Sequence, residues 1–299
     1  MSQKLYIVGA AKAGTTSLQE YLAQHPKICF SEIKEPHFFS TDIKVENFRE
    51  EYKKSLHSNR KTRHQAFIRN KEEYLKLFKS CQANQYSGDA STSYLYSQVA
   101  AKAIHEYAPD AKIIILLRDP SERAFSHYAM NRRAGFTELP FLQEVSRDQK
   151  QKDRAWGKAH LYIDLGMYYQ QVKRYIELFE ASQIKLIRFD TFTENTSQIV
   201  AEVLHFLDLD QVSLNVEEVH NPKRIPKSRK AIQLIRKLNL VSLVPHKLKL
   251  LSRKFLYAQK DEIPQLQASQ KAYLNKQYFM EDIVQLETML QLDLSDWYA

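Results

Sequence analysis

Cysteine and long apolar runs are scarce in this sequence, and each scarcity excludes a class of protein. Only two cysteines occur among 299 residues, Cys29 and Cys81. Without a CxxC spacing they predict neither a disulfide framework nor a zinc site, and they are typical of a reducing cytosol. No run approaches the roughly 18 apolar residues of a membrane helix, and the first residues lack the apolar core of a signal peptide. The sequence therefore predicts a soluble, full-length, cytoplasmic protein without integral membrane association.

Apolar and positively charged residues, in contrast, are abundant. Hydrophobic residues make up 43 % of the chain, which is enough for a sizeable core. A length of 299 residues fits one α/β domain with insertions, so we expect a single domain over residues 1–299. The formal net charge of +9 favours anionic partners such as nucleotides, acidic sugars, lipid surfaces or nucleic acid. The same charge is consistent with solubility alone, so it does not choose among these partners.

Three apolar runs predict buried strands, each followed by a helical pattern. They are Lys4–Val8, Lys112–Leu117 and Lys185–Phe189, and Lys27 to Phe30 predicts a shorter, edge-like strand. The unbroken sequence KIIILL is typical of a strand covered on both faces of a parallel sheet. Asp119-Pro120 after it is a helix cap followed by a proline in the first turn. This alternation predicts an α/β, P-loop-like three-layer fold, with a central parallel sheet flanked by helices.

Three segments fall outside this alternation. Residues 41–80 are charged and have a helical pattern, which predicts a helical insertion packed over the sheet. Residues 135–164 are polar with few regular signals, which indicates a long loop or lid. Residues 216–299 predict a basic, helical C-terminal extension with the loop NPKRIPKSRK at its entrance.

The segment GAAKAGTT, from Gly9 to Thr16, connects the first predicted strand to the first predicted helix. Two glycines allow a tight turn, and the free N–H groups of the loop and helix start form an anion site. The glycine spacing matches a Walker A loop, but Thr15 occupies the position of the Walker lysine. The lysine lies inside the loop instead, as Lys12, where its ammonium is beside the cradled group. The alternative is an ordinary glycine turn with an exposed lysine.

A second candidate half-site follows the strongest strand. Arg118 ends that strand, and Ser126 lies about two turns into the next helix. Ligands of parallel sheets bind at the carboxyl ends of the strands, so Arg118 would stand beside the first loop if the two strands are neighbours. A guanidinium and a hydroxyl suit a terminal phosphate monoester. The alternative is a salt-bridged strand end and an ordinary helix serine.

Together these residues carry a resemblance to a known family. LYIVGAAKAGTTSLQEYLAQHPKICFSEIKEPHFF resembles the 5′-phosphosulfate-binding region of sulfotransferases that use 3′-phosphoadenosine 5′-phosphosulfate (PAPS). KIIILLRDPSERAFSHYAMN resembles their 3′-phosphate-binding region, and the match is closest to the branch of heparan sulfate sulfotransferases and bacterial relatives. GMYYQQVKRYIELFEASQIKLIRFDTF and HFLDL resemble a later helix–strand–helix unit of that branch.

The resemblance implies PAPS as co-substrate, its product 3′-phosphoadenosine 5′-phosphate (PAP), and a set of donor contacts. For the 5′-phosphosulfate these are Lys12, Ala13, Gly14, Thr15, Thr16 and Ser17, and for the 3′-phosphate they are Arg118 and Ser126. A basic C-terminal loop closes over the nucleotide in relatives, which makes Arg224 and Lys227 weaker candidates. No metal is expected, because the transferred group carries less charge than a phosphoryl group and no carboxylate cluster indicates a magnesium site.

The resemblance also implies the catalytic side of the site. In KEPHFF, Glu35 falls where these enzymes often place their base, while Lys12 would stabilise charge on the leaving oxygen. His37 is a candidate to orient Glu35, to contact the acceptor or to be the base. GDASTSYLY departs from relatives by having Asp89 and no proline. Tyr94 and Tyr96 are either ligand contacts or one face of a strand.

The expected acceptor is a hydroxyl or amine of a carbohydrate or glycoconjugate, acidic in character, shaped by residues 41–80 and by an acceptor-side loop at 135–164. Two other functions remain open. A P-loop kinase is disfavoured by Thr15 and by the lack of a metal-binding aspartate after a strand. A basic module for anionic polysaccharide or nucleic acid is disfavoured because aromatic residues are not interleaved with the basic ones. No nucleic-acid partner is therefore expected.

Overall fold

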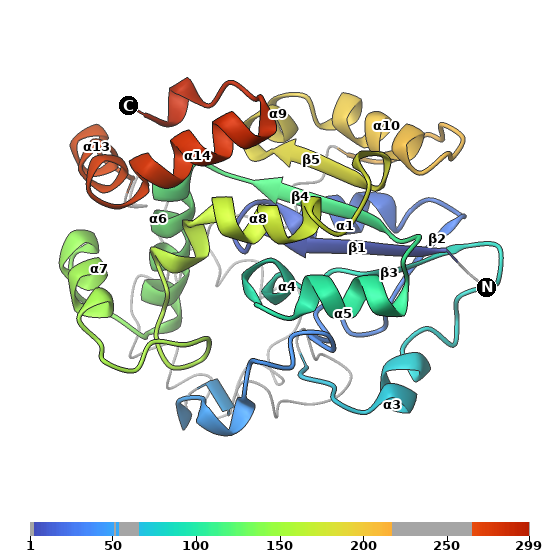
Figure 1. Cartoon of the computed structure of the whole chain (residues 1–299), viewed down its shortest axis with the longest axis horizontal. Coiled ribbons are helices and arrows are strands. Elements are labelled where there is room, and N and C mark those ends of the chain that lie inside the picture. Colours follow the sequence, from blue (N-terminus) through green and yellow to red (C-terminus); the bar gives the residue numbers. More distant parts are fainter. Residues whose placement is uncertain (1–2, 51, 54–65, 217–264, 299) are drawn as a thin grey trace, which may run out of the picture.

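The fold is built on five parallel strands that are ordered β2-β3-β1-β4-β5 (Figure 1). The computed structural model describes residues 3–50, 52–53, 66–216 and 265–298. The strands are β1 (Lys4–Gly9), β2 (Ile28–Phe30), β3 (Tyr86–Asp89), β4 (Lys112–Leu117) and β5 (Ile184–Arg188). Their carboxyl ends point toward helix α6 (Pro120–Ala134), at the left of Figure 1. The predicted α/β fold with a central parallel sheet is confirmed.

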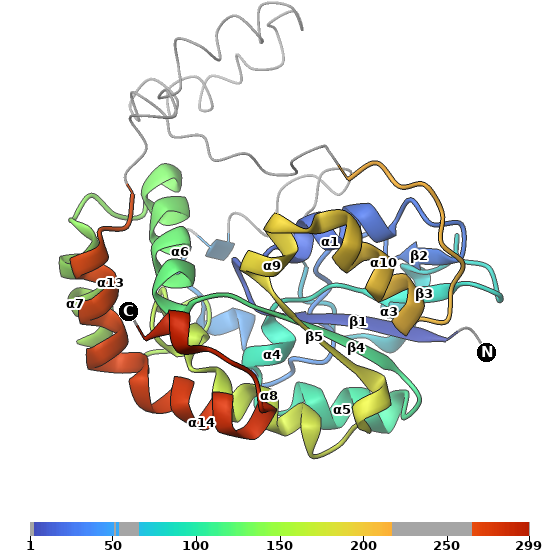
Figure 2. The same ribbon diagram turned by 90° about the horizontal axis from the view of Figure 1, so that it is seen from above.

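Helices cover both faces of this sheet, which gives three layers (Figure 2). One face carries α1 (Thr15–Leu22), α9 (Phe189–Glu194) and α10 (Thr196–Phe206). The other face carries α4 (Ser93–Tyr96), α5 (Ala100–Tyr107) and α8 (Tyr168–Ile176), with α14 (Met280–Leu290) packed against α8. Elsewhere in the described residues, the helices are α3 (Lys71–Lys76), α7 (Phe141–Gln149), α13 (Ala268–Leu274) and the short turns Val45–Asn47, Asp164–Gly166, Ala181–Gln183, Asn275–Phe279 and Ser295–Trp297.

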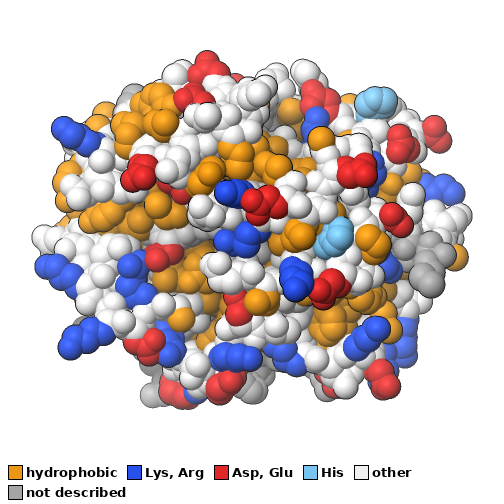
Figure 3. Space-filling view, in the orientation of Figure 1, with side chains coloured by type: hydrophobic (Ala, Val, Ile, Leu, Met, Phe, Trp, Pro, Cys, Tyr) orange, Lys and Arg blue, Asp and Glu red, His pale blue; other side chains and the backbone are white. Residues whose placement is uncertain are grey.

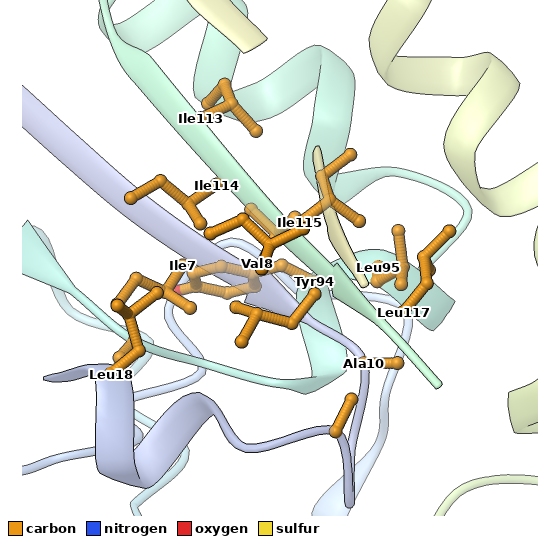
Figure 4. Close-up of a cluster of buried hydrophobic side chains, with 14 of the residues drawn as sticks. Ile7, Val8, Ala10, Leu18, Tyr94, Leu95, Ile113, Ile114, Ile115 and Leu117 are labelled. Carbon is orange, nitrogen blue, oxygen red and sulfur yellow. The ribbon is translucent and has the colours of Figure 1, made fainter. Parts of the chain in front are cut away.

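The core lies where β1 and β4 pair at the centre of the sheet (Figure 4). Five consecutive residues of β4, Ile113 to Leu117, are at most 1 % exposed, because helices cover both faces of the strand. Ile7 and Val8 of β1 are equally buried beside them. Burial of each such side chain contributes about 1.5–3 kcal/mol. This rigid centre fixes the positions of the loops that follow β1 and β4.

The strands predicted from apolar runs are present, but β3 was not predicted. Its sequence, YSGD, contains a glycine and an aspartate, which are depleted in strands, so no local pattern marks it. Pairing with β1 on one side and β2 on the other makes it a strand. The prediction of Tyr94 and Tyr96 on a strand face is wrong, since both lie in the short helix α4.

Residues 135–164 contain the nine-residue helix α7, so the prediction of an irregular loop is wrong over Phe141–Gln149. Phe141, Glu144, Val145 and Asp148 are its buried residues, spaced as one face of a helix. Two of those four positions are charged, which hid the helical pattern. The Glu144 carboxylate accepts a hydrogen bond from Thr137 at 2.6 Å and Asp148 accepts one from the backbone N–H of His160 at 2.7 Å.

The two cysteines form a disulfide, so the prediction of unpaired cysteines is wrong. Cys29 lies on edge strand β2, and Cys81 lies on the segment that leads from α3 into β3. The parallel pairing of β2 with β3 brings these segments together, and the Cα atoms are 5.5 Å apart. A separation of 52 residues in the sequence concealed this proximity.

Loss of this disulfide is expected to lower the free energy of unfolding. A bridge between residues 52 positions apart restricts the unfolded chain, which corresponds to about 4 kcal/mol as an upper estimate. Urea unfolding of the oxidised protein should therefore show a higher midpoint than that of Cys29→Ser. Adding a reductant should lower the midpoint of the wild type and leave the variant unchanged. Equal midpoints with and without reductant in the wild type would contradict the pairing.

Candidate active site

The loop between β1 and α1 has the backbone shape of an anion-binding loop. Lys12 has φ 74° and Gly14 has φ 89°, both in the left-handed region. A Cβ on Gly14 would lie 3.0 Å from the ring of Phe189, so glycine is required there for space as well as for conformation. The N–H of Ala10 donates to the carbonyl of Leu116 at 2.6 Å, which ties the loop to the end of β4. The N-terminus of α1 follows directly at Thr15.

Lys12 lies inside this loop and points toward helix α6. Its ammonium is 3.5 Å from the sulfur of Met130. Burial, together with the positive charges of Arg133, Arg118 and Arg123, lowers the pKa of Lys12 to about 8, against the opposing effect of Glu35. The lysine is thus held in a concentration of positive charge. An anion that entered this place would be attracted by all of these groups.

Arg118 stands at the end of β4, beside the loop, as the parallel-sheet argument predicts. Its Nη1 is 3.5 Å from the carbonyl oxygen of Lys12, so the two predicted half-sites are in contact. The guanidinium lies 4.5 Å from the centre of the Phe189 ring and donates to the Glu122 carboxylate at 2.8 Å. Glu122 is partly exposed, so a phosphate that bound Arg118 would compete with a carboxylate at the surface.

The remaining donor candidates fall into two groups. Ala13 is buried in the loop, and Thr15, Thr16 and Ser17 are the first three residues of α1, where free N–H groups point outward. Ser126 is partly exposed on α6. Arg224 and Lys227 lie outside the described residues.

Glu35 and His37 are both buried on the segment that follows β2. One oxygen of Glu35 accepts a hydrogen bond from Lys34 at 3.0 Å, and the other lies 3.3 Å from His37 Nε2 and accepts from Thr92 at 3.2 Å. Burial raises the pKa of Glu35, but the Lys34 ammonium and His37 outweigh it and hold the pKa well below its usual range. Because the charge of Glu35 acts on the pKa of Lys12, the carboxylate also lies near the loop.

His37 is held from two sides. Its Nδ1 is 2.6 Å from the Ser93 hydroxyl, and its ring is stacked on Phe67 with 4.4 Å between the ring centres. The edge of Trp156 is also close, at 6.1 Å between ring centres. This ring is therefore fixed beside Glu35, and of the roles open to it the geometry is compatible with orienting the carboxylate.

Comparison with known proteins identifies the family of this chain. A family model described as the sulfotransferase domain matches residues 2–230, which is more than half of the chain. The chain belongs to the sulfotransferase family. The resemblance carried by the two phosphate-binding regions is thereby confirmed.

Individual sulfotransferases are similar to this chain over about 70 % of its length. Carbohydrate sulfotransferase 15 of Mus musculus is 22 % identical over 246 residues, covering 70 % of this chain and 44 % of the relative. Heparan sulfate glucosamine 3-O-sulfotransferase 6 of Homo sapiens is 26 % identical over 211 residues, covering 69 % of this chain and 52 % of the relative. The chain thus spans about half the length of the curated relatives it matches.

A solved structure matches over the whole length. A sulfotransferase from Alicyclobacillus acidocaldarius has a TM-score of 0.74 and 26 % identity, with all of both chains covered. This match over the whole length confirms the predicted P-loop-like fold.

Sequence reasoning missed one charged residue of this sulfotransferase site, Arg123 on α6. It is fully buried and donates through Nη2 to the carbonyl of Tyr162. Within the described part of the chain, its Nε and Nη1 have no hydrogen-bond partner. Burial lowers the pKa of Arg123 to about 10. The sequence did not indicate Arg123, because a residue five positions after Arg118 does not lie on the same face of a helix.

The described residues contain neither a metal-binding cluster nor a membrane-spanning helix. Among them, no group of three or more histidine, cysteine or acidic side chains is arranged to hold a metal ion. The same residues contain no helix that is both long and apolar enough to cross a membrane.

The lowered pKa of Lys12 predicts a pH dependence of nucleotide binding. Lys12 is charged below its pKa of about 8 and neutral above it, so affinity for PAP should fall as the pH rises from 7 to 9. One pH unit above the pKa only about a tenth of the lysine is charged, which allows a loss of up to about tenfold. Calorimetric titration with PAP measures this loss. Lys12→Arg keeps its charge over this range and should give a flat profile, and an equal slope in both proteins would contradict the assignment.

Proposed function

We propose that this protein transfers a sulfuryl group from PAPS to a hydroxyl or amine of a carbohydrate or glycoconjugate acceptor. The observation that carries the proposal is the contact between the two donor half-sites. Arg118 reaches the backbone of the Lys12 loop at 3.5 Å, across the paired strands β1 and β4. A nucleotide with phosphate groups at both its 5′ and 3′ positions needs two anion sites at this kind of spacing, and family membership supplies PAPS as the donor.

The donor roles follow from the charges. The loop N–H groups and the N-terminus of α1, with Thr15, Thr16 and Ser17, hold the nonreacting phosphosulfate oxygens. Arg118 and Ser126 hold the 3′-phosphate. Lys12 stabilises the negative charge that grows on the bridging oxygen as the bond to sulfur breaks. We keep Arg224 and Lys227 as proposed contacts of a covering loop.

Glu35 is the proposed base. The acceptor oxygen forms a bond to sulfur, the bond from sulfur to the bridging oxygen breaks, and the acceptor proton passes to Glu35. A carboxylate held at a low pKa is ionised at neutral pH, but it is a weak base toward a free alcohol. The acceptor hydroxyl becomes far more acidic as its oxygen bonds to sulfur, so the transfer becomes favourable late in the reaction. His37 orients the carboxylate at 3.3 Å.

The acceptor is proposed from the relatives and from the surroundings of Glu35. Both curated relatives described above are named for carbohydrate or heparan sulfate acceptors. We propose that the segments 41–80 and 135–164 contribute to the acceptor side, because Phe67 of the first and Trp156 of the second flank His37. Aromatic faces can stack on sugar rings. The acidic character of the acceptor stays a proposal that depends on the net positive charge.

The face shown in Figure 3 gives no support to the alternative of a nonenzymatic module for anionic polymers. On the face shown in Figure 3, lysine and arginine side chains are interspersed with acidic ones and form no continuous basic patch. Polymer binding by charge alone requires such a patch. The kinase alternative still faces Thr15 at the position of the Walker lysine.

Cytoplasmic localisation also stays a prediction, and the structure removes one of the two arguments for it. The prediction depends on cysteines that indicate no disulfide framework and on apolar runs that are too short for a membrane helix. The Cys29–Cys81 disulfide removes the first support, because structural disulfides are rare in a reducing cytosol.

Binding of PAP tests the donor site. The wild type should bind PAP with micromolar affinity and should prefer it to ATP, because ATP lacks the 3′-phosphate that pairs with Arg118. Arg118→Ala should remove that preference, since the loss of a charge-assisted pair costs about 1.5–3 kcal/mol. Glu122→Gln is the matched control: it removes the competing carboxylate, keeps the guanidinium, and should bind PAP at least as tightly. Calorimetry that finds no PAP binding, or equal binding of ATP, would contradict the proposed function.

Replacement of the proposed base separates chemistry from binding. Glu35→Gln should lower kcat by about 10²–10⁴-fold, because the amide cannot accept the proton, while affinity for PAP should stay within a few fold. Sulfuryl transfer to heparosan, chondroitin and simple phenols, assayed with labelled PAPS, provides the measurement. Full activity of the variant with an unshifted pH profile would show that Glu35 is not the base.

A further inference from the structure

A buried carboxylate underlies the segment that carries Glu35 and His37. Asp89 is the last residue of β3 and is fully buried. It accepts hydrogen bonds from three hydroxyl groups: Ser91 at 2.7 Å, Tyr94 at 2.7 Å and Tyr74 at 3.0 Å. Among the described residues, no lysine, arginine or histidine forms an ion pair with it. A charge buried without a cation is costly, so its presence calls for an explanation.

Two of these hydroxyl groups hold the backbone of the catalytic segment. The N–H of His37 donates to the Ser91 hydroxyl at 3.1 Å, and the N–H of Phe38 donates to the Tyr94 hydroxyl at 3.0 Å. Each of these two hydroxyl groups has one proton, which it donates to Asp89. The oxygen of each hydroxyl therefore has a lone pair free to accept a hydrogen bond from the backbone N–H. The carboxylate thus fixes the direction of both hydroxyls, and through them the position of two consecutive backbone groups.

The backbone at His37 needs such support. Its φ of 49° lies in the left-handed region, which is uncommon for a residue with a bulky side chain and costs of order 1–3 kcal/mol. The carbonyl of His37 is held too, by Arg69 at 2.6 Å and by the Ser40 hydroxyl at 3.1 Å. In this conformation the imidazole and the Glu35 carboxylate lie on the same side, 3.3 Å apart.

The same short segment also reaches the side chains of the catalytic pair. Thr92 donates to Glu35 at 3.2 Å, and Ser93 lies 2.6 Å from His37 Nδ1. Four consecutive residues after Asp89 and Ala90 therefore each contact the Glu35–Phe38 segment: Ser91, Thr92, Ser93 and Tyr94. These four residues together hold the catalytic segment in position.

We propose that Asp89 is a positioning residue for the transfer reaction, which through Ser91 and Tyr94 holds Glu35 and His37 in their catalytic arrangement. This inference rests on the proposed function, in which Glu35 is the base. Burial raises the pKa of Asp89 to about 6, against the hydrogen bonds from Ser91, Tyr94 and Tyr74 and with a further increase from the nearby charge of Glu35. Tyr6 and Tyr175 also face it. At neutral pH the group is ionised and acts as an acceptor only.

Hydrogen–deuterium exchange of the Glu35–Phe38 segment tests the proposal without an acceptor. In Asp89→Asn one of the two carboxylate oxygens becomes an NH2 group, which places a donor against either the Ser91 hydroxyl or the Tyr94 hydroxyl, so at least one of the N–H groups of His37 and Phe38 should exchange about tenfold faster. Ser91→Ala should accelerate His37 alone. Asp282→Asn is the matched control: Asp282 is also buried, accepts two backbone N–H groups, of Tyr168 and Tyr169, and has a pKa raised to about 6. It should leave exchange at residues 35–38 unchanged.

Kinetics separate positioning from general stability. Release of PAP from PAPS, with water or heparosan as acceptor, should be at least about tenfold slower in Asp89→Asn than in Asp282→Asn, at an unchanged Kd for PAP. Asp89→Glu, which keeps the carboxylate, should recover part of the rate. Unchanged exchange at His37 and Phe38, or a rate loss no larger than that of the control, overturns the proposal. If Asp89→Asn fails to fold, Ser91→Ala decides the question by the same two measurements. A wild type that neither binds PAP nor releases it from PAPS would instead refute the proposed function.

Discussion

The parallel pairing of β1 with β4 is the constraint on which the site depends. Both strands are fully covered, so their register is fixed by the core rather than by the loops. The loop after β1 carries Lys12 and the first residue after β4 is Arg118, so the pairing alone brings two cations to one edge. Residues more than a hundred positions apart thus become halves of one anion site, without any specific contact being required to assemble it.

Several cations gather at this edge of the sheet. Besides burial, the positive charges of Arg133, Arg118 and Arg123 lower the pKa of Lys12, and among the described residues the Arg123 Nε and Nη1 have no hydrogen-bond partner. Only Glu122 pairs with Arg118, and it does so from a partly exposed position. A buried cation without a counter-charge is costly. The same cost becomes binding energy for an anion, which is why the site suits a nucleotide that carries phosphate groups at both ends.

A feature of this structure could be predicted from the sequence when a continuous stretch of residues determines it. The donor side was predictable, because GAAKAGTT, KIIILL and Arg118-Asp119-Pro120 are continuous in the sequence and each has a direct backbone consequence. The disulfide, strand β3 and helix α7 were not predictable in this way. Cys29 and Cys81 meet only after β2 and β3 pair, and YSGD becomes a strand only between two others.

The catalytic side could be predicted only in part. Glu35 and His37 were found through a resemblance, but their geometry depends on a residue with positive φ and on four side chains from a segment more than 50 positions away. No period or spacing in the sequence encodes such an arrangement. The departure noticed in GDASTSYLY, an aspartate and no proline, therefore lies at the place where the structure supports the catalytic segment. The Ser91 and Tyr94 hydroxyls there donate to Asp89 and accept hydrogen bonds from the N–H groups of His37 and Phe38, so they connect the carboxylate to the catalytic segment.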